Sequence, residues 1–152
     1  MQNKINSLKL RMKDNNVDLV VLGPGTHMNW LLGFNPYPDE RPCMLLIGKE
    51  KEAFLMPSVN AEDARKRTDI AINSWNDENG PDQALKEALL YIGESSAKHI
   101  AIDEAMRSHF ALILIEALSN PSYEFTASTI GALRMRKDQT EFINLKENAL
   151  ID

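Results

Sequence analysis

The sequence predicts an α/β fold, a three-layer sandwich in which a mixed sheet of about six strands lies between helices. Short β-branched apolar runs alternate along the chain with amphipathic segments of helical period, which is typical of this class. One pair of runs has the spacing of a hairpin, which adds antiparallel pairing to an otherwise partly parallel sheet. The 152 residues suit one domain, and the contents of 43% hydrophobic and 26% charged residues are those of an ordinary globular protein.

The first elements follow from periodicity and turn signals. Apolar residues recur every three or four positions over 4–12, which predicts an amphipathic surface helix. The apolar run 17–22 stops at a Gly-Pro-Gly turn and predicts a buried strand. The stretch 27–34 is too short to place by its period and predicts a short helix or an irregular turn. Three prolines in 35–42 withhold backbone donors and predict a loop.

The remaining elements alternate between strand and helix. The compact apolar runs 43–47 and 53–56 flank a short polar segment and predict a hairpin. Good helix formers and further short apolar runs then follow one another. The expected helices are 58–67, 82–91, 108–118 and 140–152, and the expected strands are 70–75, 99–102 and 123–127.

Charge and cysteine content narrow the possible functions. Seventeen Lys and Arg against 22 Asp and Glu give a net charge of -5, and the basic residues are scattered, which argues against a nucleic-acid partner. No apolar run approaches the roughly 18 residues of a membrane span, so no membrane partner is expected. The single cysteine, Cys43, and an N-terminus without a secretory apolar region favour a cytoplasmic protein.

The residues show no pattern typical of a catalytic or metal site, so neither is expected here. The three histidines lie in segments without a helical pair of metal ligands. Asp103 and Glu104 are expected at a solvated strand end, where neighbouring side chains point to opposite faces. Cys43 opens an apolar strand and is expected to be a buried hydrophobe rather than a nucleophile.

The segment 23–28, Gly-Pro-Gly-Thr-His-Met, leaves an alternative function open. It follows the first strand at the place where a dinucleotide fingerprint would lie. The third glycine is missing and Pro24 removes a donor from the loop, so a plain turn is favoured. The alternative is a stand-alone α/β module that binds a nucleotide or another small ligand at this turn.

Two segments resemble the N-terminal domain of the creatinase and prolidase family. Residues 29–34, Asn-Trp-Leu-Leu-Gly-Phe, resemble the family's Asn-x-x-Tyr-Leu-Thr-Gly-Phe segment, from which Trp30 and Leu32 depart. Residues 133–141, Leu-Arg-Met-Arg-Lys-Asp-Gln-Thr-Glu, resemble its Leu-Arg-x-x-Lys-x-x-x-Glu junction. The two occur in the family's order, so the resemblance spans the chain.

The resemblance implies a hydrolase of C–N amide bonds, of the Xaa-Pro dipeptidase, aminopeptidase or creatinase type. Residues 1–136 would be its non-catalytic N-terminal domain and 137–152 the start of a linker helix. A C-terminal pita-bread catalytic domain would follow as partner, with two divalent metal ions such as Mn, Co or Zn. The fragment itself is expected to need no cofactor and to be inactive alone. The full protein would be a homodimer, in which this domain serves dimerisation and substrate access.

The resemblance also implies that the proline-rich loop reaches toward a substrate. The candidate substrate-recognition residues are Arg41, Tyr37 and Trp30, and no catalytic residue is expected. Arg41 is a fixed cation suited to a carboxylate or carbonyl, and Tyr37 is amphipathic. The alternative for Arg41 is a surface ion pair with Asp39 or Glu40.

Overall fold

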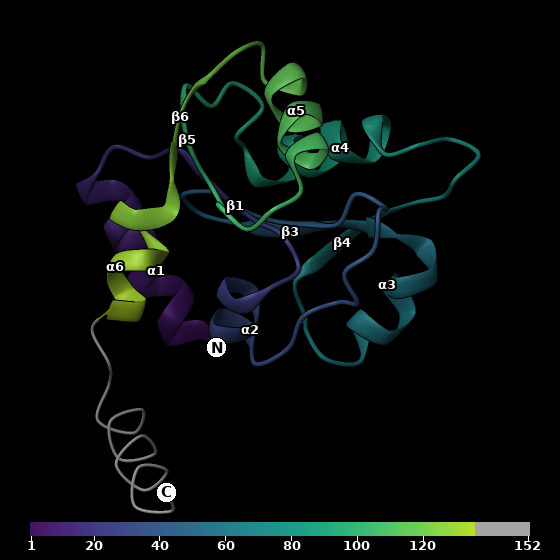
Figure 1. Cartoon of the computed structure of the whole chain (residues 1–152), viewed down its shortest axis with the longest axis horizontal. Coiled ribbons are helices and arrows are strands. Elements are labelled where there is room, and N and C mark those ends of the chain that lie inside the picture. Colours follow the sequence, from purple (N-terminus) through teal and green to yellow (C-terminus); the bar gives the residue numbers. More distant parts are fainter. Residues whose placement is uncertain (136–152) are drawn as a thin grey trace, which may run out of the picture.

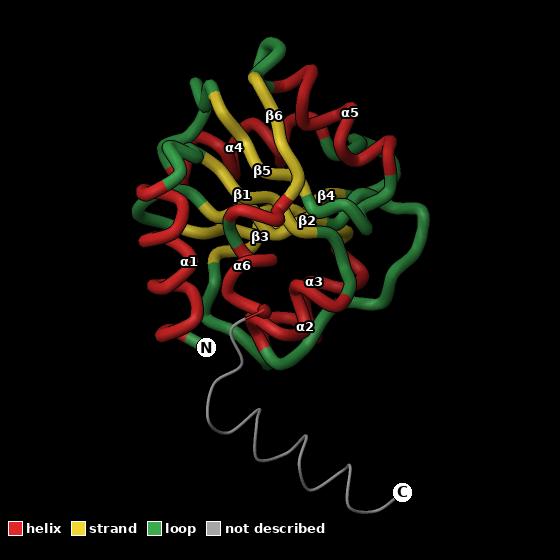
Figure 2. Tube along the Cα trace, turned by 60° about the vertical axis from the view of Figure 1, so that its left-hand side comes forward, coloured by secondary structure: helices red, strands yellow, loops and turns green. Residues whose placement is uncertain are grey.

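A six-stranded mixed sheet separates two layers of helices (Figures 1 and 2). The structure, a computed structural model, describes residues 1–135. The strands are β1 (Leu19–Leu22), β2 (Met44–Ile47), β3 (Glu52–Pro57), β4 (Ala71–Trp75), β5 (His99–Ile102) and β6 (Ser122–Phe125), in the order β4-β3-β2-β1-β5-β6. The helices are α1 (Gln2–Asp14), α2 (Thr26–Leu32), α3 (Ser58–Arg65), α4 (Asp82–Ile92), α5 (Ser108–Ala117), the 3-10 helix η1 (Thr126–Ser128) and α6 (Ile130–Met135).

The pairing of the strands confirms the predicted mixed sheet. The hairpin of β2 and β3 is antiparallel, and β2 also pairs antiparallel with β1. The pairs β1 with β5, β3 with β4 and β5 with β6 are parallel. The chain therefore forms an antiparallel centre with a parallel strand or pair on each side.

Both faces of the central strands β1 and β2 are buried. Val20 and Leu22 pack with α1, α2 and α3, whereas Leu19 and Val21 pack with α4 and α5. Because side chains alternate across a strand, one continuous apolar run can supply both cores. This explains why β1 has no polar position, and it confirms the three-layer α/β sandwich.

The differences from the sequence-based elements are local. The stretch 27–34 forms α2, which ends at Gly33 in the left-handed conformation (φ 80°). The strand expected over 123–127 ends at Phe125, because the chain turns there into η1. The helix α6 was not predicted separately. The helix expected over 140–152 and the linker 137–152 lie outside the described residues.

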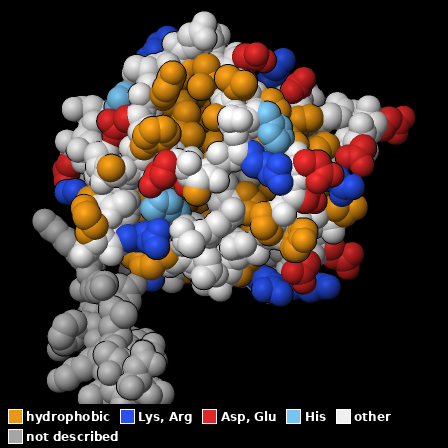
Figure 3. Space-filling view, in the orientation of Figure 1, with side chains coloured by type: hydrophobic (Ala, Val, Ile, Leu, Met, Phe, Trp, Pro, Cys, Tyr) orange, Lys and Arg blue, Asp and Glu red, His pale blue; other side chains and the backbone are white. Residues whose placement is uncertain are grey.

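Apolar side chains remain exposed at one edge of the sheet. Tyr123 and Phe125 on the edge strand β6 are 64% and 66% exposed, and Leu112 on α5 is also exposed. Figure 3 shows apolar side chains gathered toward the top of the molecule, over the region of β6 and α5. Among residues 1–135, no helix combines the length and the apolar character needed to cross a bilayer.

Asp18 connects three parts of the sheet just before β1. Its Oδ2 accepts the backbone N–H groups of Lys98 (2.8 Å) and His99 (3.0 Å), and its Oδ1 lies 2.6 Å from Nζ of Lys49. Burial alone would raise the pKa of Asp18, but the hydrogen bonds from Lys49, Lys98 and His99 outweigh it and lower that pKa. The carboxylate therefore stabilises the fold in its charged form.

We predict that Asp18→Ala lowers the free energy of unfolding by about 2 kcal/mol at neutral pH, as expected for hydrogen bonds to a charged group. Because the folded-state pKa is depressed, this contribution is present above the ordinary pKa of Asp and is lost as the pH falls through the lower folded value. Urea unfolding at about pH 7 and about pH 3.5 measures it. Asp14→Ala, at an exposed position, is the control. An equal loss at both pH values would contradict the prediction.

Candidate functional site

The proline-rich loop 35–42 is fastened to the domain at its C-terminal end. The indole Nε1–H of Trp75 donates to the carbonyl of Pro42 over 2.9 Å, and this contact is buried. Two residues before Pro42, the carbonyl oxygen of Glu40 lies 3.0 Å from Nε2 of His109, so the imidazole ring donates to it. Two elements that are distant in the sequence, β4 and α5, therefore hold the same end of the loop.

The three predicted recognition residues occupy different surroundings. Tyr37 is 78% exposed, in the part of the loop before these anchors. The Arg41 side chain is 34% exposed, and its Nε lies 3.6 Å from Oδ1 of Asp77. The expected neighbour Asp39 instead accepts the backbone N–H of Arg41 over 2.8 Å. Trp30 lies half-buried in α2, where Nζ of Lys4 lies 4.2 Å from the centre of its ring.

A groove lies between the loop and α3. It has a volume of about 460 Å³. Its walls combine apolar surface with an ion pair, because Nε of Arg67 lies 3.3 Å from Oδ2 of Asp63 and its guanidinium lies 6.0 Å from the centre of the Phe34 ring. Of the predicted residues only Tyr37 lines it; the lining residues are Phe34, Asn35, Pro36, Tyr37, Pro38, Val59, Asn60, Asp63, Ala64 and Arg67.

A second polar site lies at the carboxyl ends of β1 and β5. His27 follows β1 in α2, and Asp103 and Glu104 follow β5 directly. Because β1 and β5 are parallel neighbours, their ends meet at one edge of the sheet. The expectation of a solvated strand end is wrong for Asp103, which is only 2% exposed. The reason is that β5 ends at Ile102, so the alternation of a strand no longer governs the two acids.

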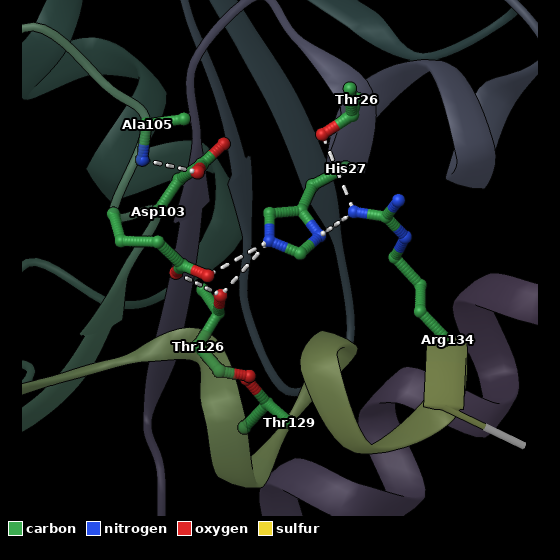
Figure 4. Close-up of polar contacts among 8 residues, drawn as sticks. Thr26, His27, Asp103, Ala105, Thr126, Thr129 and Arg134 are labelled. Carbon is green, nitrogen blue, oxygen red and sulfur yellow. Dashed lines mark hydrogen bonds and ion pairs between the residues drawn. The ribbon is translucent and has the colours of Figure 1, made fainter.

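The His27 ring is held between a cation and an anion (Figure 4). Its Nδ1 lies 3.0 Å from Nη1 of Arg134, and its Nε2 lies 3.3 Å from Oε1 of Glu104. A guanidinium offers only donors, so Nδ1 must accept and the ring proton belongs on Nε2. Thr126 completes the network, since its hydroxyl donates to Oε2 of Glu104 over 2.6 Å and lies 3.4 Å from Nε2.

The pKa values of the two carboxyl groups of the cluster are shifted in opposite directions. Burial raises the pKa of Asp103, and the backbone N–H of Ala105 at 2.9 Å offsets only part of this effect. Burial also acts to raise the pKa of Glu104. There, however, the hydrogen bonds from Thr126, from its own backbone and from His27 outweigh it and lower the pKa to about 2.

His27, Asp103 and Glu104 are close enough to raise the question of a metal ion, since their potential ligand atoms lie within 4.8 Å of one another. A histidine that binds a metal through Nε2 carries its proton on Nδ1 and donates it to an acceptor. Arg134 occupies that place and cannot accept. In this arrangement the cluster is a hydrogen-bond network rather than a set of metal ligands.

Sequence reasoning missed this cluster, although a signal for it was present. Counted back from Gly33 and Phe34, the Asn of the eight-residue family pattern falls on His27. Arg134 is the arginine of the second pattern. The two motifs that carried the resemblance therefore contact each other directly, 107 residues apart in the chain. The motifs pointed to these two positions, but their contact follows from the tertiary packing.

Comparison with known proteins agrees with the fold. A family model described as the creatinase/prolidase N-terminal domain matches residues 4–136. The chain is similar to a dipeptidase from Pyrococcus horikoshii OT3, with a TM-score of 0.79, 24% identity and coverage of 90% of this chain and 38% of that one. For a prolidase from Thermococcus sibiricus the TM-score is 0.80 and the identity 20%, with coverage of 93% of this chain and 38% of that one. For a proline dipeptidase from Streptococcus pneumoniae TIGR4 the TM-score is 0.78 and the identity 19%, with coverage of 88% of this chain and 98% of that one.

The chain thus spans 38% of the length of the first two of these structures and nearly all of the third. Their identities are too low to carry more than the fold. None of the curated proteins matches the chain.

We predict that Thr126→Val raises the pKa of Glu104 from about 2 toward the ordinary 4.5, because the substitution removes the hydroxyl that donates to the carboxylate. It should also lower the free energy of unfolding by about 1–2 kcal/mol at neutral pH. The stabilisation belongs to the charged form, so it persists above the ordinary pKa and is lost as the pH falls toward 2.

An NMR titration of the Glu104 side-chain carboxyl carbon gives the pKa in both proteins. Thr68→Val, which removes a buried hydroxyl at another place, is the matched control and should leave Glu104 unchanged. The same pKa in the wild type and in Thr126→Val would show that the hydroxyl is not the cause.

Proposed function

The chain belongs to the creatinase/prolidase N-terminal domain family, and on that premise we propose that it is the non-catalytic N-terminal domain of a longer hydrolase of C–N amide bonds. In this proposal the domain presents the loop 35–42 to the substrate and contributes to dimerisation. Xaa-Pro peptides or creatine-like amides are the proposed substrate class. The protein is proposed to act in the cytoplasm.

The construction of the loop is the observation that carries the proposal. The C-terminal end of the loop is fixed through Trp75 and His109, whereas the Tyr37 side chain nearer its start is 78% exposed. Prolines at 36, 38 and 42 further reduce the conformational entropy lost when the loop is ordered. A loop that is stiff but displays an aromatic ring to solvent is suited to contact with a ligand, because little ordering cost remains at binding.

The surroundings of the reactive side chains support a non-catalytic role. Burial, together with the charge of Asp39, raises the pKa of the Cys43 thiol to about 12, so the thiolate nucleophile is not formed near neutral pH. The Nδ1 atom of His27, which a base would use, already accepts from Arg134. We therefore place the chemistry in residues outside 1–135.

The paired metal ions implied by the resemblance find no fitting site in the described part of the chain. The one cluster with suitable atoms has a donor, Arg134, where a metal-bound His27 would need an acceptor. No step of the reaction is assigned to this domain through a metal. We propose that Mn, Co or Zn ions, where used, are held by the catalytic domain.

The dimerisation part of the proposal is supported by exposed apolar surface. Leu112, Tyr123 and Phe125 are more than half exposed on α5 and β6. Contiguous apolar patches of this kind commonly mark contacts with another protein. Sedimentation equilibrium of the longer protein tests this part, and a monomer at micromolar concentration would remove it.

The nucleotide-binding alternative is disfavoured by the charge at the 23–28 turn. The backbone N–H of Gly23, which a phosphate would need, faces the carboxyl group of the buried Asp103. A buried acid beside the turn repels a phosphate. Titration with NAD and ATP while the Trp30 fluorescence is followed separates the two functions, because saturable micromolar quenching would favour the alternative.

The proposal requires the coding sequence to continue beyond Asp152 into a catalytic domain. Reading that sequence for a series of Asp, Asp, His, Glu and Glu ligands is the direct check. A stop codon immediately after Asp152 would contradict the proposal.

We predict that Tyr37→Ala and Arg41→Ala each lower kcat/KM of the longer enzyme at least about tenfold, which is roughly 1.4 kcal/mol of transition-state binding. Each should leave the free energy of unfolding of the domain within about 0.5 kcal/mol, as for other surface changes. Matched controls are Tyr91→Ala on α4 and Arg65→Ala on α3, both at exposed positions. An unchanged kcat/KM on several dipeptides would contradict the prediction and leave Arg41 only a surface ion pair with Asp77.

A further inference from the structure

The contact between His27 and Arg134 depends on the charge of the histidine. Nδ1 can accept from Nη1 of Arg134 at 3.0 Å only while it carries no proton. A proton from solvent added at Nδ1 would place two N–H donors and two positive charges against each other. The hydrogen bond would be lost and replaced by repulsion.

The other side of the ring favours the opposite outcome. The Nε2–H group faces the Glu104 carboxylate at 3.3 Å, and the buried Asp103 lies beside it. Both acids stabilise a positive ring, whereas Thr126 from η1 is uncharged. Among the described residues, the charged groups that face the ring are therefore two acids after β5 and one cation from α6, and a protonated ring keeps the acids and loses the cation.

The guanidinium of Arg134 can move away from the His27 ring once Nδ1 carries a proton. Among the described residues, its other contact runs from Nη1 to the Thr26 hydroxyl and is long at 3.3 Å and exposed. The guanidinium can therefore turn toward water at little cost. The ring itself is 7% exposed and remains fixed by Glu104 and Thr126.

The contacts that hold α6 to the domain are unevenly distributed along it. Within the described residues it runs from Ile130 to Met135. Its start is anchored by the buried Ile130 and by the Thr129 hydroxyl, which donates to the carbonyl of Thr126. Toward its end, Leu133 packs only partly against the core, and Arg134 ties the last turn to α2. Loss of the Arg134 contact therefore acts on the last turn of α6.

We propose that the His27–Arg134 contact is a proton-sensitive latch: a proton added at Nδ1 of His27 releases Arg134 and loosens α6 at Leu133 to Met135. This property belongs to the chain itself and does not require the proposed hydrolase function.

Hydrogen exchange of the chain, followed by NMR, tests the latch. The amides of Leu133, Arg134 and Met135 are compared at about pH 7.5 and about pH 5.5, after correction for intrinsic exchange, with the β1 amides as reference. We expect their protection to fall about fivefold on acidification, the equivalent of one ordinary hydrogen bond. The ¹⁵N shifts of the imidazole should show the Nε2–H form at the higher pH and the doubly protonated form at the lower.

Three variants separate the latch from other pH effects. His27→Asn does not titrate and should abolish the fall in protection. Arg134→Met should give low protection in α6 at both pH values. His99→Asn, which removes a histidine paired with Glu124 on the β5–β6 side, should keep the wild-type response.

Three results would overturn the proposal. The first is a wild-type α6 whose protection is unchanged although the NMR shifts show that His27 is protonated. The second is a ring that stays neutral down to about pH 5.5. The third is a full pH response that persists in both His27→Asn and Arg134→Met.

Discussion

The rest of the structure depends on the burial of β1 on both of its faces. Val20 and Leu22 require one layer of helices, and Leu19 and Val21 require the other. With water excluded from both sides, every backbone group of the strand must find its partner in β2 or β5. The parallel partner β5 then places the segment after it beside the turn after β1. His27 therefore lies close to Asp103 and Glu104 because the backbone of the central strand β1 forms its hydrogen bonds with β5.

The fold was largely predictable because its signals are local. The run 17–22, the polar turn between β2 and β3 and the helical period of α4 each specify an element within a few residues. The order of the strands is not local information. Without it, neither the proximity of β1 to β5 nor the burial of Asp103 could be derived, and the rule of strand alternation was applied to Asp103 and Glu104 one residue beyond the end of β5.

The site illustrates the same limit. The sequence identified the loop 35–42 through its prolines, but not its attachment to Trp75 and His109, which are distant in the chain. The alternative to substrate recognition for Arg41 was an ion pair with Asp39 or Glu40, yet its charged partner is Asp77 from the segment after β4. Side-chain partners at such separations follow from tertiary packing, and single-sequence patterns carry no information on them.

The strand order also has a consequence for the time course of folding. The strands β1 to β4 are consecutive in the chain, so these four strands can pair as soon as they are synthesised. The neighbour on the other side of β1 is made later, since β5 begins at His99, 52 residues after β2 ends at Ile47. At ordinary ribosome speeds this interval lasts roughly 3 to 10 s. During it, the most apolar strand of the domain is a temporary sheet edge, open to wrong partners until β5 arrives.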